Sequence, residues 1–185
     1  MTDIYFIRHA ESDFSVKDDL KRPLTFKGNR DSIQIPILFE GVDIDAFFSS
    51  PCKRAVDTIN PLCKERKKDI TQVDDFRERK IGQWIDDFFE YASKQWNDFS
   101  HSLLQGESLE EVQKRNVDAL KALLVEYKEQ SIVIGTHGTA LCTIINYYDY
   151  TKGYEYFKSI VDVMPLIVKM RFEESRLIFM HEMRL

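Results

Sequence analysis

Cysteine is scarce in this sequence, and no two cysteines are closely spaced. Cys52, Cys63 and Cys142 are odd in number, and none belongs to a C-x-x-C pair. A disulfide framework and a zinc ribbon both require paired cysteines, so we expect neither. Isolated, reduced thiols are typical of a cytoplasmic protein, which is the location that we predict.

Long apolar runs are also missing. The apolar stretch near the N-terminus covers only residues 4–7, which is too short for the core of a signal peptide. Residues 130–148 carry no Asp, Glu, Lys or Arg, but they contain too many polar side chains for a membrane-spanning helix. We therefore predict neither secretion nor a membrane partner, and we interpret residues 130–148 as a strand, a turn and a helix.

The chain has no excess of basic residues. Lys and Arg total 26 against 31 Asp and Glu, which gives a net charge of -5. A protein that holds nucleic acid by its phosphates normally carries a basic excess, so we expect no nucleic-acid partner. The chain also has no repeat and no linker-like tract, and 185 residues is close to the usual size of one domain. We predict a single domain over residues 1–185.

Apolar periodicity predicts strands that alternate with helices. The expected strands cover residues 3–8, 44–49, 70–73 and 131–136, and the expected helices cover residues 26–39, 51–67, 86–99, 109–128 and 139–148. Two apolar runs, residues 163–171 and 176–180, predict a terminal hairpin. Alternating strands and helices indicate an α/β fold, a three-layer α/β/α sandwich with a mainly parallel sheet.

Several helix starts carry recognisable signals. Thr25 is expected to cap the first helix, which Pro36 should bend or shorten. Ser50 and Pro51 are expected to supply an N-cap and a first helical residue. Ser108 and Glu111 have the spacing of a capping box.

Polar residues follow three of the predicted strands. Arg8 and His9 end the first, His137 and Gly138 follow the fourth, and Arg54 lies in the helix after the second. Ligands of open α/β sheets bind beyond the carboxyl ends of the strands, and helix N-termini attract anions. Any one of these residues alone has a simpler interpretation as a turn or solvated helix residue. Together they predict that two arginines and two histidines converge on one phosphoryl group.

The chain resembles the histidine phosphatase superfamily, the phosphoglycerate mutase-like proteins, over most of its length. Six motifs of that family occur here in order. They are Arg8-His9-Ala10-Glu11, Leu24-Thr25-Phe26-Lys27-Gly28, Ser50 through Arg54-Ala55 to Thr58, Glu78 through Gly82 to Trp84, Gly106-Glu107-Ser108, and Thr136-His137-Gly138.

The resemblance implies a phosphatase with a phosphoglycerate mutase-like fold that needs no metal and no cofactor. His9 is implied as the nucleophile that forms a phosphohistidine, and Glu78 as the general acid and base. Arg8, Arg54 and His137 are implied as ligands of the phosphoryl oxygens, and Gly138 is assigned to the same phosphate-binding set. Neutral imidazole is the reactive form of His9, and the neighbouring Arg8 cation is expected to keep it unprotonated.

The chain departs from the family pattern at two positions. The usual glycine after the nucleophilic histidine is Ala10, which adds a methyl group close to the phosphate without removing the backbone N–H. Relatives that process phosphoglycerate often carry an asparagine a few residues later, where this chain has Ser15. We expect the Ser15 hydroxyl to contribute to phosphate binding with a shorter reach.

The segment around residues 84–105 is expected to form a short helical cap rich in aromatic and acidic side chains. Mutases of the family carry a long, basic segment there, so the resemblance favours hydrolysis of a small-molecule phosphomonoester by a monomer or homodimer. Two alternatives stay open: a cofactor-dependent phosphoglycerate mutase-type phosphotransferase, and a non-catalytic phosphate-binding or regulatory module on the same fold. Arg115 is as readily a structural ion-pair partner as a site residue, and His101 and His181 have no predicted role.

Overall fold

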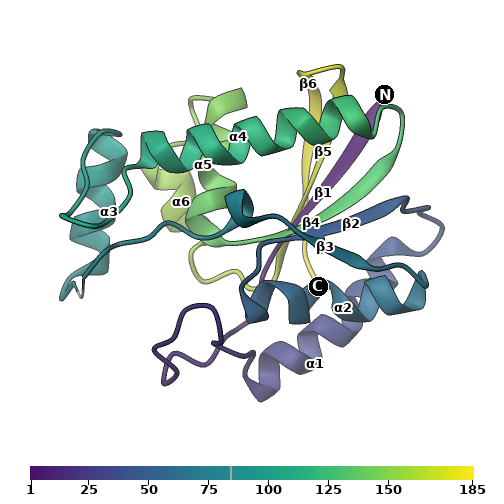
Figure 1. The fold of residues 1–185 in the computed structure, drawn as a ribbon, viewed down its shortest axis with the longest axis horizontal. Helices are drawn as coiled ribbons and strands as arrows, with labels where there is room; N and C mark the ends of the chain where they lie inside the picture. Colours follow the sequence, from purple (N-terminus) through teal and green to yellow (C-terminus); the bar gives the residue numbers. More distant parts are fainter. Residues whose placement is uncertain (84) are drawn as a thin grey trace.

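A six-stranded mixed sheet forms the centre of the computed structural model, which describes residues 1–83 and 85–185. The strand order is β3-β2-β4-β1-β5-β6 (Figure 1). The strands are β1 (Thr2–Arg8), β2 (Ala46–Ser49), β3 (Ile70–Gln72), β4 (Ser131–Thr136), β5 (Leu166–Glu173) and β6 (Arg176–Met183). Trp84, which belongs to one of the family motifs and to the expected cap, lies outside the described residues.

Most of the sheet is parallel. β3, β2, β4 and β1 pair in parallel, whereas β5 pairs antiparallel with β1 and with β6. The predicted strands and the terminal hairpin are therefore confirmed, with ends shifted by a few residues. The sheet is mixed because β5 runs antiparallel to both of its neighbours, β1 and β6.

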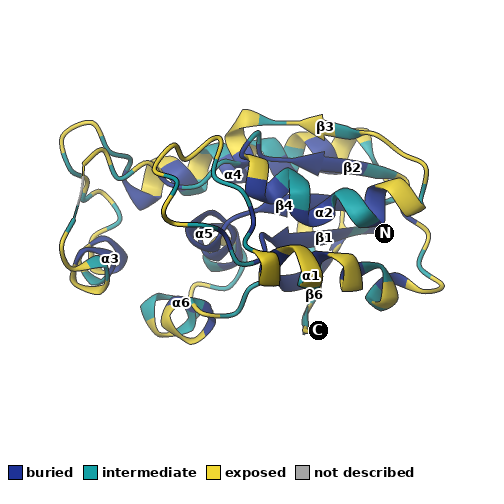
Figure 2. Cartoon of the chain, turned by 90° about the horizontal axis from the view of Figure 1, so that it is seen from below, coloured by how far each residue is buried: buried dark blue, intermediate teal, exposed yellow. Residues whose placement is uncertain are grey.

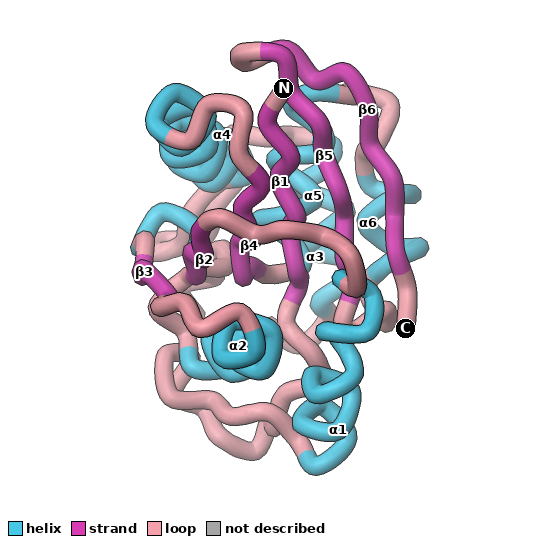
Figure 3. The backbone as a smooth tube through the Cα atoms, turned by 90° about the vertical axis from the view of Figure 1, so that its right-hand side faces the viewer, coloured by secondary structure: helices cyan, strands magenta, loops and turns pink. Residues whose placement is uncertain are grey.

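Helices cover both faces of the sheet (Figures 1 and 3). One face carries α1 (Phe26–Gln34), the 3-10 helix η1 (Ile35–Phe39) and α2 (Lys53–Glu65). The other carries α4 (Leu109–Glu126), α5 (Gly138–Tyr148) and α6 (Tyr154–Ile160), with α3 (Phe88–Asn97) beyond α6. A second short 3-10 helix, η2, covers Asp74–Phe76. This arrangement confirms the predicted α/β/α sandwich.

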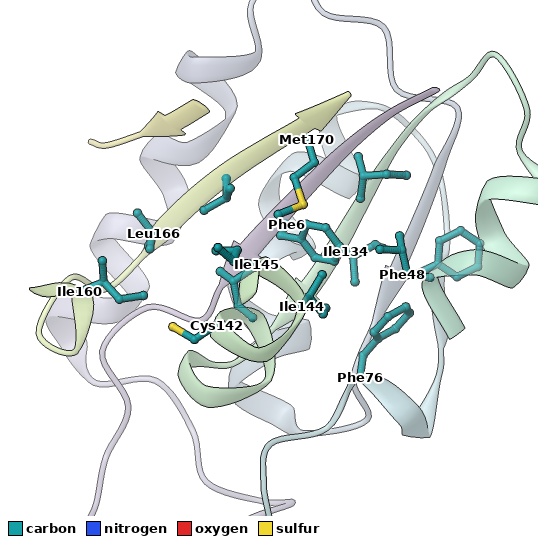
Figure 4. Packing of buried hydrophobic residues seen from close by; sticks show 14 of the residues in the cluster. Phe6, Phe48, Phe76, Ile134, Cys142, Ile144, Ile145, Ile160, Leu166 and Met170 are labelled. Carbon is teal, nitrogen blue, oxygen red and sulfur yellow. The ribbon is translucent and has the colours of Figure 1, made fainter. Parts of the chain in front are cut away.

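The alternation of side chains along β1 separates the two cores. Ile4 and Phe6 belong to the cluster under α4, α5 and α6, whereas Tyr5 and Ile7 belong to the cluster under α1 and α2. Figure 4 shows Phe6 packed in the larger cluster with side chains of neighbouring strands and of α5. Because successive strand residues point to opposite faces, a strand segment buried on both sides is apolar at every position, as residues 4–7 of β1 are.

The predicted helix signals are confirmed at two N-termini. The Thr25 side chain accepts a hydrogen bond from the Gly28 N–H at the start of α1. Ser108 and Glu111 form a complete capping box at the start of α4. Pro36 also shortens the first helix as expected, because α1 ends at Gln34 and the chain continues as η1.

Other helix predictions were wrong or incomplete. α2 begins at Lys53, with Cys52 at its N-cap, so Ser50 and Pro51 are not its first residues. The Ser50 hydroxyl bonds to His137 and accepts from the N–H of Cys52, which precedes the first residue of α2. α2 also continues through Pro61, and α6 has no counterpart among the predicted elements.

The segment that contains α3 lies beyond the carboxyl ends of the strands, on the side of α5 and α6 (Figures 1 and 2). Its aromatic side chains pack mainly on α6: Phe88 and Trp96 lie 6.1 and 5.9 Å from Phe157 between ring centroids. Phe89 remains 45% exposed. None of the helices in residues 1–83 and 85–185 combines the length and apolar character that crossing a membrane requires.

Gly28 is expected to be essential for stability, because α1 passes against the backbone of Glu11. A Cβ at position 28 would lie 2.1 Å from the Glu11 carbonyl oxygen, and backbone cannot move aside cheaply. We expect Gly28→Ala to lower the free energy of unfolding by about 2–4 kcal/mol in urea denaturation. Gly153→Ala is the matched control, since nothing lies within 4 Å of its Cβ position, and equal losses in the two variants would contradict this packing.

Candidate active site

Three adjacent strands bring the predicted site residues to one edge of the sheet. Arg8 pairs with Thr136 in register between β1 and β4, and Ser49 pairs with Gly135 between β2 and β4. The residues that follow are His9, His137 and Ser50. Because the three strands are parallel and end within one residue of one another, these three side chains lie close together.

The His9 and His137 rings are in contact. Their centroids lie 5.2 Å apart with an interplanar angle of 64°. The chain segments that carry them are also joined by backbone, since the His9 N–H donates to the Thr136 carbonyl at 3.0 Å. Two imidazoles that are remote in sequence therefore share one site, as predicted.

Hydrogen bonding determines which nitrogen of His9 is free to react. His9 Nδ1 lies 2.8 Å from the Ala10 carbonyl oxygen. A carbonyl only accepts, so Nδ1 carries the proton and donates it. The lone pair of the neutral ring is then on Nε2, which is the atom available as a nucleophile.

His137 is held by Ser50. His137 Nε2 lies 2.7 Å from the Ser50 hydroxyl, which also accepts a hydrogen bond from the Cys52 N–H at 3.2 Å. The opposite ring nitrogen, Nδ1, is buried without a hydrogen-bond partner. His137 therefore presents one unused polar atom inside the site.

Both histidines are neutral near pH 7. Burial, followed by the nearby Arg54 cation, lowers the pKa of His9 to about 3, and Arg8 adds a smaller contribution. The same two leading causes, burial and then Arg54, hold the pKa of His137 well below its usual range. The expectation that Arg8 keeps His9 neutral is thus only part of the cause, since burial and Arg54 act more strongly.

Arg54 is the cation that acts most strongly on both imidazoles, and it is 1% exposed. Its Nη1 donates to the backbone carbonyl of Asp19 at 2.6 Å, and its Nη2 lies 3.1 Å from the Asp19 carboxylate. Its Nε is buried without a partner. The predicted phosphate ligand is therefore beside the histidines, with a carboxylate already on one of its outer nitrogens and a backbone carbonyl on the other.

Arg8 is the second arginine of the site, and two of its guanidinium nitrogens already donate to backbone carbonyls. Its Nη1 and Nη2 donate to the carbonyls of Ile160, Val161 and Val163, at the end of α6 and just after it. Its Nε is buried without a partner. A Cβ at Gly138 would lie 3.2 Å from the Arg8 guanidinium, so the glycine allows Arg8 to pack closely under the start of α5.

Glu78 reaches the N-terminus of α5, directly after His137. Its Oε1 accepts from the N–H groups of Arg79 at 2.7 Å and Ala140 at 3.1 Å, and its Oε2 accepts from Thr139 at 3.0 Å. Oε2 thus has one of its lone pairs unused. The predicted acid/base residue lies next to the histidine pair and is oriented by backbone donors.

Arg115 fixes the segment that carries Glu78. Its guanidinium forms a two-pronged pair with Glu107, at 2.9 and 3.0 Å, and donates to the carbonyls of Asp75, Arg77 and Glu78. Burial acts to raise the pKa of Glu107, but hydrogen bonds from Arg115 and the Lys80 N–H lower it overall. The structural interpretation of Arg115 is therefore the one that fits.

Arg79, the residue directly after Glu78, holds the segment that contains α3 in place. Its guanidinium bonds to the Gln95 side chain and lies 5.7 Å from the Phe88 ring centroid and 5.2 Å from that of Tyr91. Gln95 in turn donates to the carbonyls of His101 and Glu107. The described part of the expected cap is thereby held beside the site.

One predicted contributor, Ser15, is placed differently from expectation. Ser15 lies in an exposed loop, where its N–H donates to the Asp13 carboxylate, and no described contact joins it to the histidine pair. The Ala10 N–H, which the sequence retains, donates to the Thr58 hydroxyl at 2.9 Å. Within the described residues, no cluster of three His, Cys, Asp or Glu side chains has the arrangement of a metal site.

Sequence reasoning missed three residues at this site. Ser50 was interpreted as a helix cap, although it lies within a quoted motif. Asp19 and Arg22 were not singled out: they lie in an irregular loop with no periodicity, and Arg22 contributes to the pKa of His9. No pattern in the sequence indicates that this loop folds back onto Arg54.

Comparisons with known proteins agree on the family. The sequence model described as histidine phosphatase superfamily (branch 1) matches residues 4–176. The chain is 31% identical over 154 residues to a 2,3-bisphosphoglycerate-dependent phosphoglycerate mutase of Thermoplasma acidophilum, covering 77% of this chain and 74% of that protein. It is 26% identical over 149 residues to the uncharacterized phosphatase PhoE of Bacillus subtilis, covering 78% and 76%.

Solved structures share the fold. YhfR of Bacillus stearothermophilus superposes with a TM-score of 0.78 at 21% identity, covering 96% of this chain and 94% of that one. A phosphoserine phosphatase of Entamoeba histolytica, solved as an H9A mutant with phosphoserine, gives a TM-score of 0.77 at 20% identity with the same coverage. Both likenesses confirm a phosphoglycerate mutase-like fold.

The neutral, buried histidines predict a specific loss of stability in acid. An unfolded histidine takes up a proton below about pH 6.5, whereas folded His9, with a pKa of about 3, does not. Protonation therefore favours unfolding as the pH falls below about 6.5, by up to about 2 kcal/mol per histidine at pH 5. Urea denaturation in phosphate-free buffer at pH 7 and pH 5 should show a smaller drop for His9→Asn than for wild type. Identical drops would contradict the burial of a neutral His9.

Proposed function

This chain belongs to the histidine phosphatase superfamily (branch 1), and we propose that it hydrolyses a small-molecule phosphomonoester through a covalent phosphohistidine on His9. The proposal uses neither a metal ion nor an organic cofactor. Fixed cations and neutral donors of the chain take the place of a metal in stabilising the charge of the phosphoryl group.

One observation carries this proposal: the pair of neutral histidines and the two arginines beside it have three buried nitrogens without a hydrogen-bond partner. Arg8 Nε, Arg54 Nε and His137 Nδ1 are all buried without a hydrogen-bond partner. Buried donors without partners are uncommon and call for a specific reason. A phosphoryl group supplies acceptor oxygens in several directions, and it would satisfy donors that come from β1, α2 and the start of α5 together.

The first step forms the phosphoenzyme. His9 Nε2 attacks phosphorus, the N–P bond forms, and the P–O bond to the substrate alcohol breaks. Arg8 and Arg54 stabilise the charge on the equatorial oxygens, and His137 donates through Nδ1 while Ser50 donates its hydroxyl proton to Nε2. Burial keeps His9 deprotonated, so no base is needed to activate it.

Glu78 is proposed to transfer protons in both steps. In the first, protonated Glu78 gives its proton to the oxygen of the departing alcohol. In the second, the Glu78 carboxylate takes a proton from water as the water oxygen attacks phosphorus and the N–P bond breaks, which restores neutral His9 and releases inorganic phosphate. Oε2 is the better candidate for these transfers, because it accepts one backbone hydrogen bond whereas Oε1 accepts two.

The segment beside the site favours a substrate with a single phosphate. Lys94 is the sole lysine or arginine in residues 85–105, and its ammonium group pairs with Glu90 at 2.6 Å. A bisphosphate requires a second set of cations, whereas aromatic side chains such as the exposed Phe89 suit an organic leaving group. The phosphoserine held by the Entamoeba relative is a ligand of this size.

A mutase is the second candidate, and a specific finding favours it. The relative that is 31% identical is named as a phosphoglycerate mutase. A mutase and a phosphatase share the phosphohistidine, so they differ in whether a substrate hydroxyl or water attacks it. We favour water because of the scarcity of cations in residues 85–105.

Replacing the nucleophile tests the covalent step. We expect wild-type protein to release inorganic phosphate from p-nitrophenyl phosphate in the presence of EDTA, and His9→Ala to lose on the order of 10³-fold or more in kcat. His181→Ala, on the exposed face of β6, is the matched control and should retain full activity. A His9→Ala variant with wild-type turnover would refute the mechanism. Interconversion of phosphoglycerates without phosphate release would establish the mutase instead.

Replacing Glu78 tests the proton transfers. Glu78→Gln keeps the size of the side chain and should lower kcat by about 10²–10⁴-fold for alkyl phosphates, whose alkoxide leaves poorly without a proton. With p-nitrophenyl phosphate, whose phenolate leaves readily, the rate of phosphoenzyme formation should fall much less. The burst of p-nitrophenol measures this rate. Asp74→Asn, an exposed carboxylate on the same segment, is the control. An equal loss for both leaving groups, with unchanged thermal stability, would argue against a general acid.

A further inference from the structure

Asp19 occupies the outward side of the proposed phosphate ligand Arg54. Its carboxylate oxygen Oδ1 lies 3.1 Å from Arg54 Nη2 and 3.4 Å from Arg22 Nη1, so one carboxylate bridges two guanidinium groups. Its backbone carbonyl accepts from Arg54 Nη1 at 2.6 Å. Both outer nitrogens of Arg54 therefore already have a partner in Asp19: the carboxylate for Nη2 and the backbone carbonyl for Nη1.

A carboxylate and a phosphoryl group make the same kind of bond to a guanidinium, with oxygens facing the planar fork. Arg54 and His9 are only 1% and 6% exposed. A phosphoryl group that reaches both must approach a guanidinium whose outer nitrogens face Asp19. A phosphoryl group on the unpaired Arg54 Nε would lie next to the Asp19 carboxylate on Nη2 of the same guanidinium, and two neighbouring anions repel each other.

The Asp19 side chain has an open route away from Arg54. Its side chain is 56% exposed, although the guanidinium that it contacts is buried. The loop of residues 13–22 is fastened by the Leu20 carbonyl, which accepts from the Lys53 N–H at 2.8 Å, and by Arg22 Nε, which donates to the Val16 carbonyl at 3.0 Å. Neither of these bonds involves the Asp19 carboxylate. Turning outward, the carboxylate gives up its contacts with Arg54, Arg22 and the Cys52 thiol, which donates to Oδ2 at 3.8 Å, while these two bonds of the loop stay in place.

We propose that Asp19 is an internal competitor for the phosphoryl group, which displaces its carboxylate from Arg54 and Arg22 on binding. This inference rests on the proposed function in one respect, the assignment of Arg54 as a phosphate ligand. The competition favours dianionic groups, because a phosphomonoester carries more charge than the carboxylate that it replaces. While it contacts Arg54 and Arg22, the negative charge of Asp19 also offsets part of their positive charge beside the neutral histidines.

The size of the effect follows from the exposure of Asp19. An ion pair with one half-exposed partner is worth much less than a fully buried one. Removing the competing charge should therefore tighten phosphate binding about fivefold, not by orders of magnitude. The gain should shrink in concentrated salt, since the repulsion acts across a solvent-accessible region.

The test measures the binding of inorganic phosphate by titration calorimetry to wild type, Asp19→Asn and Asp19→Ala, at low and high sodium chloride. We expect both variants to bind phosphate about fivefold more tightly at low salt, with a smaller difference at high salt. Asp18→Asn is the matched control, because it removes the same charge from the same loop, and Asp18 pairs with Lys21 instead of Arg54. Its affinity should stay closer to that of wild type.

Unchanged or weaker phosphate binding by both Asp19 variants, with wild-type thermal stability, would overturn the inference and make Asp19 a positioning residue for Arg54. Hydrolysis of p-nitrophenyl phosphate, measured on the same samples, separates the two proposals. Wild-type turnover without tighter binding by the variants refutes the competition alone. Tighter binding by the variants in a protein without turnover refutes the proposed hydrolysis alone.

Discussion

The site depends on one constraint, the register that makes three parallel strands end within one residue of one another. β2, β4 and β1 are neighbours in the sheet, and their register puts Ser50, His137 and His9 immediately beyond one edge. A slip of one residue would turn each side chain to the opposite face of the sheet. The two apolar cores, one on each face of β1, prevent such a slip, so packing far from the site fixes its geometry.

Burial gives the site its electrostatic character. Arg54 and Arg8 are cations in a region from which water is largely excluded, and both imidazoles stay neutral there. The backbone offsets part of the cost of burying these charges: carbonyls after α6 accept from Arg8, and the Asp19 carbonyl accepts from Arg54. What remains is a positive, preorganised environment that suits an anion and a neutral nucleophile.

The sequence predicted elements whose signals are local and missed contacts that depend on distant segments. The β-branched and aromatic run of β1, the Thr25 cap and the Ser108 capping box all follow from neighbouring residues. The carbonyls that hold Arg8 lie about 150 residues further along the chain, at the end of a short helix that no apolar periodicity predicted. The same is true of Ser50, whose hydroxyl bonds to a histidine 87 residues away, a contact that no local pattern indicates.

A single covalent bond, between phosphorus and His9 Nε2, is the central claim. Rapid quenching of the protein with a phosphomonoester at alkaline pH, followed by peptide mass spectrometry, tests it most directly. The account predicts one acid-labile phosphoryl group on the peptide that contains His9, formed and lost at the rate of turnover. Turnover with the phosphoryl group on another residue, or with no phosphorylated protein at any time, would contradict it.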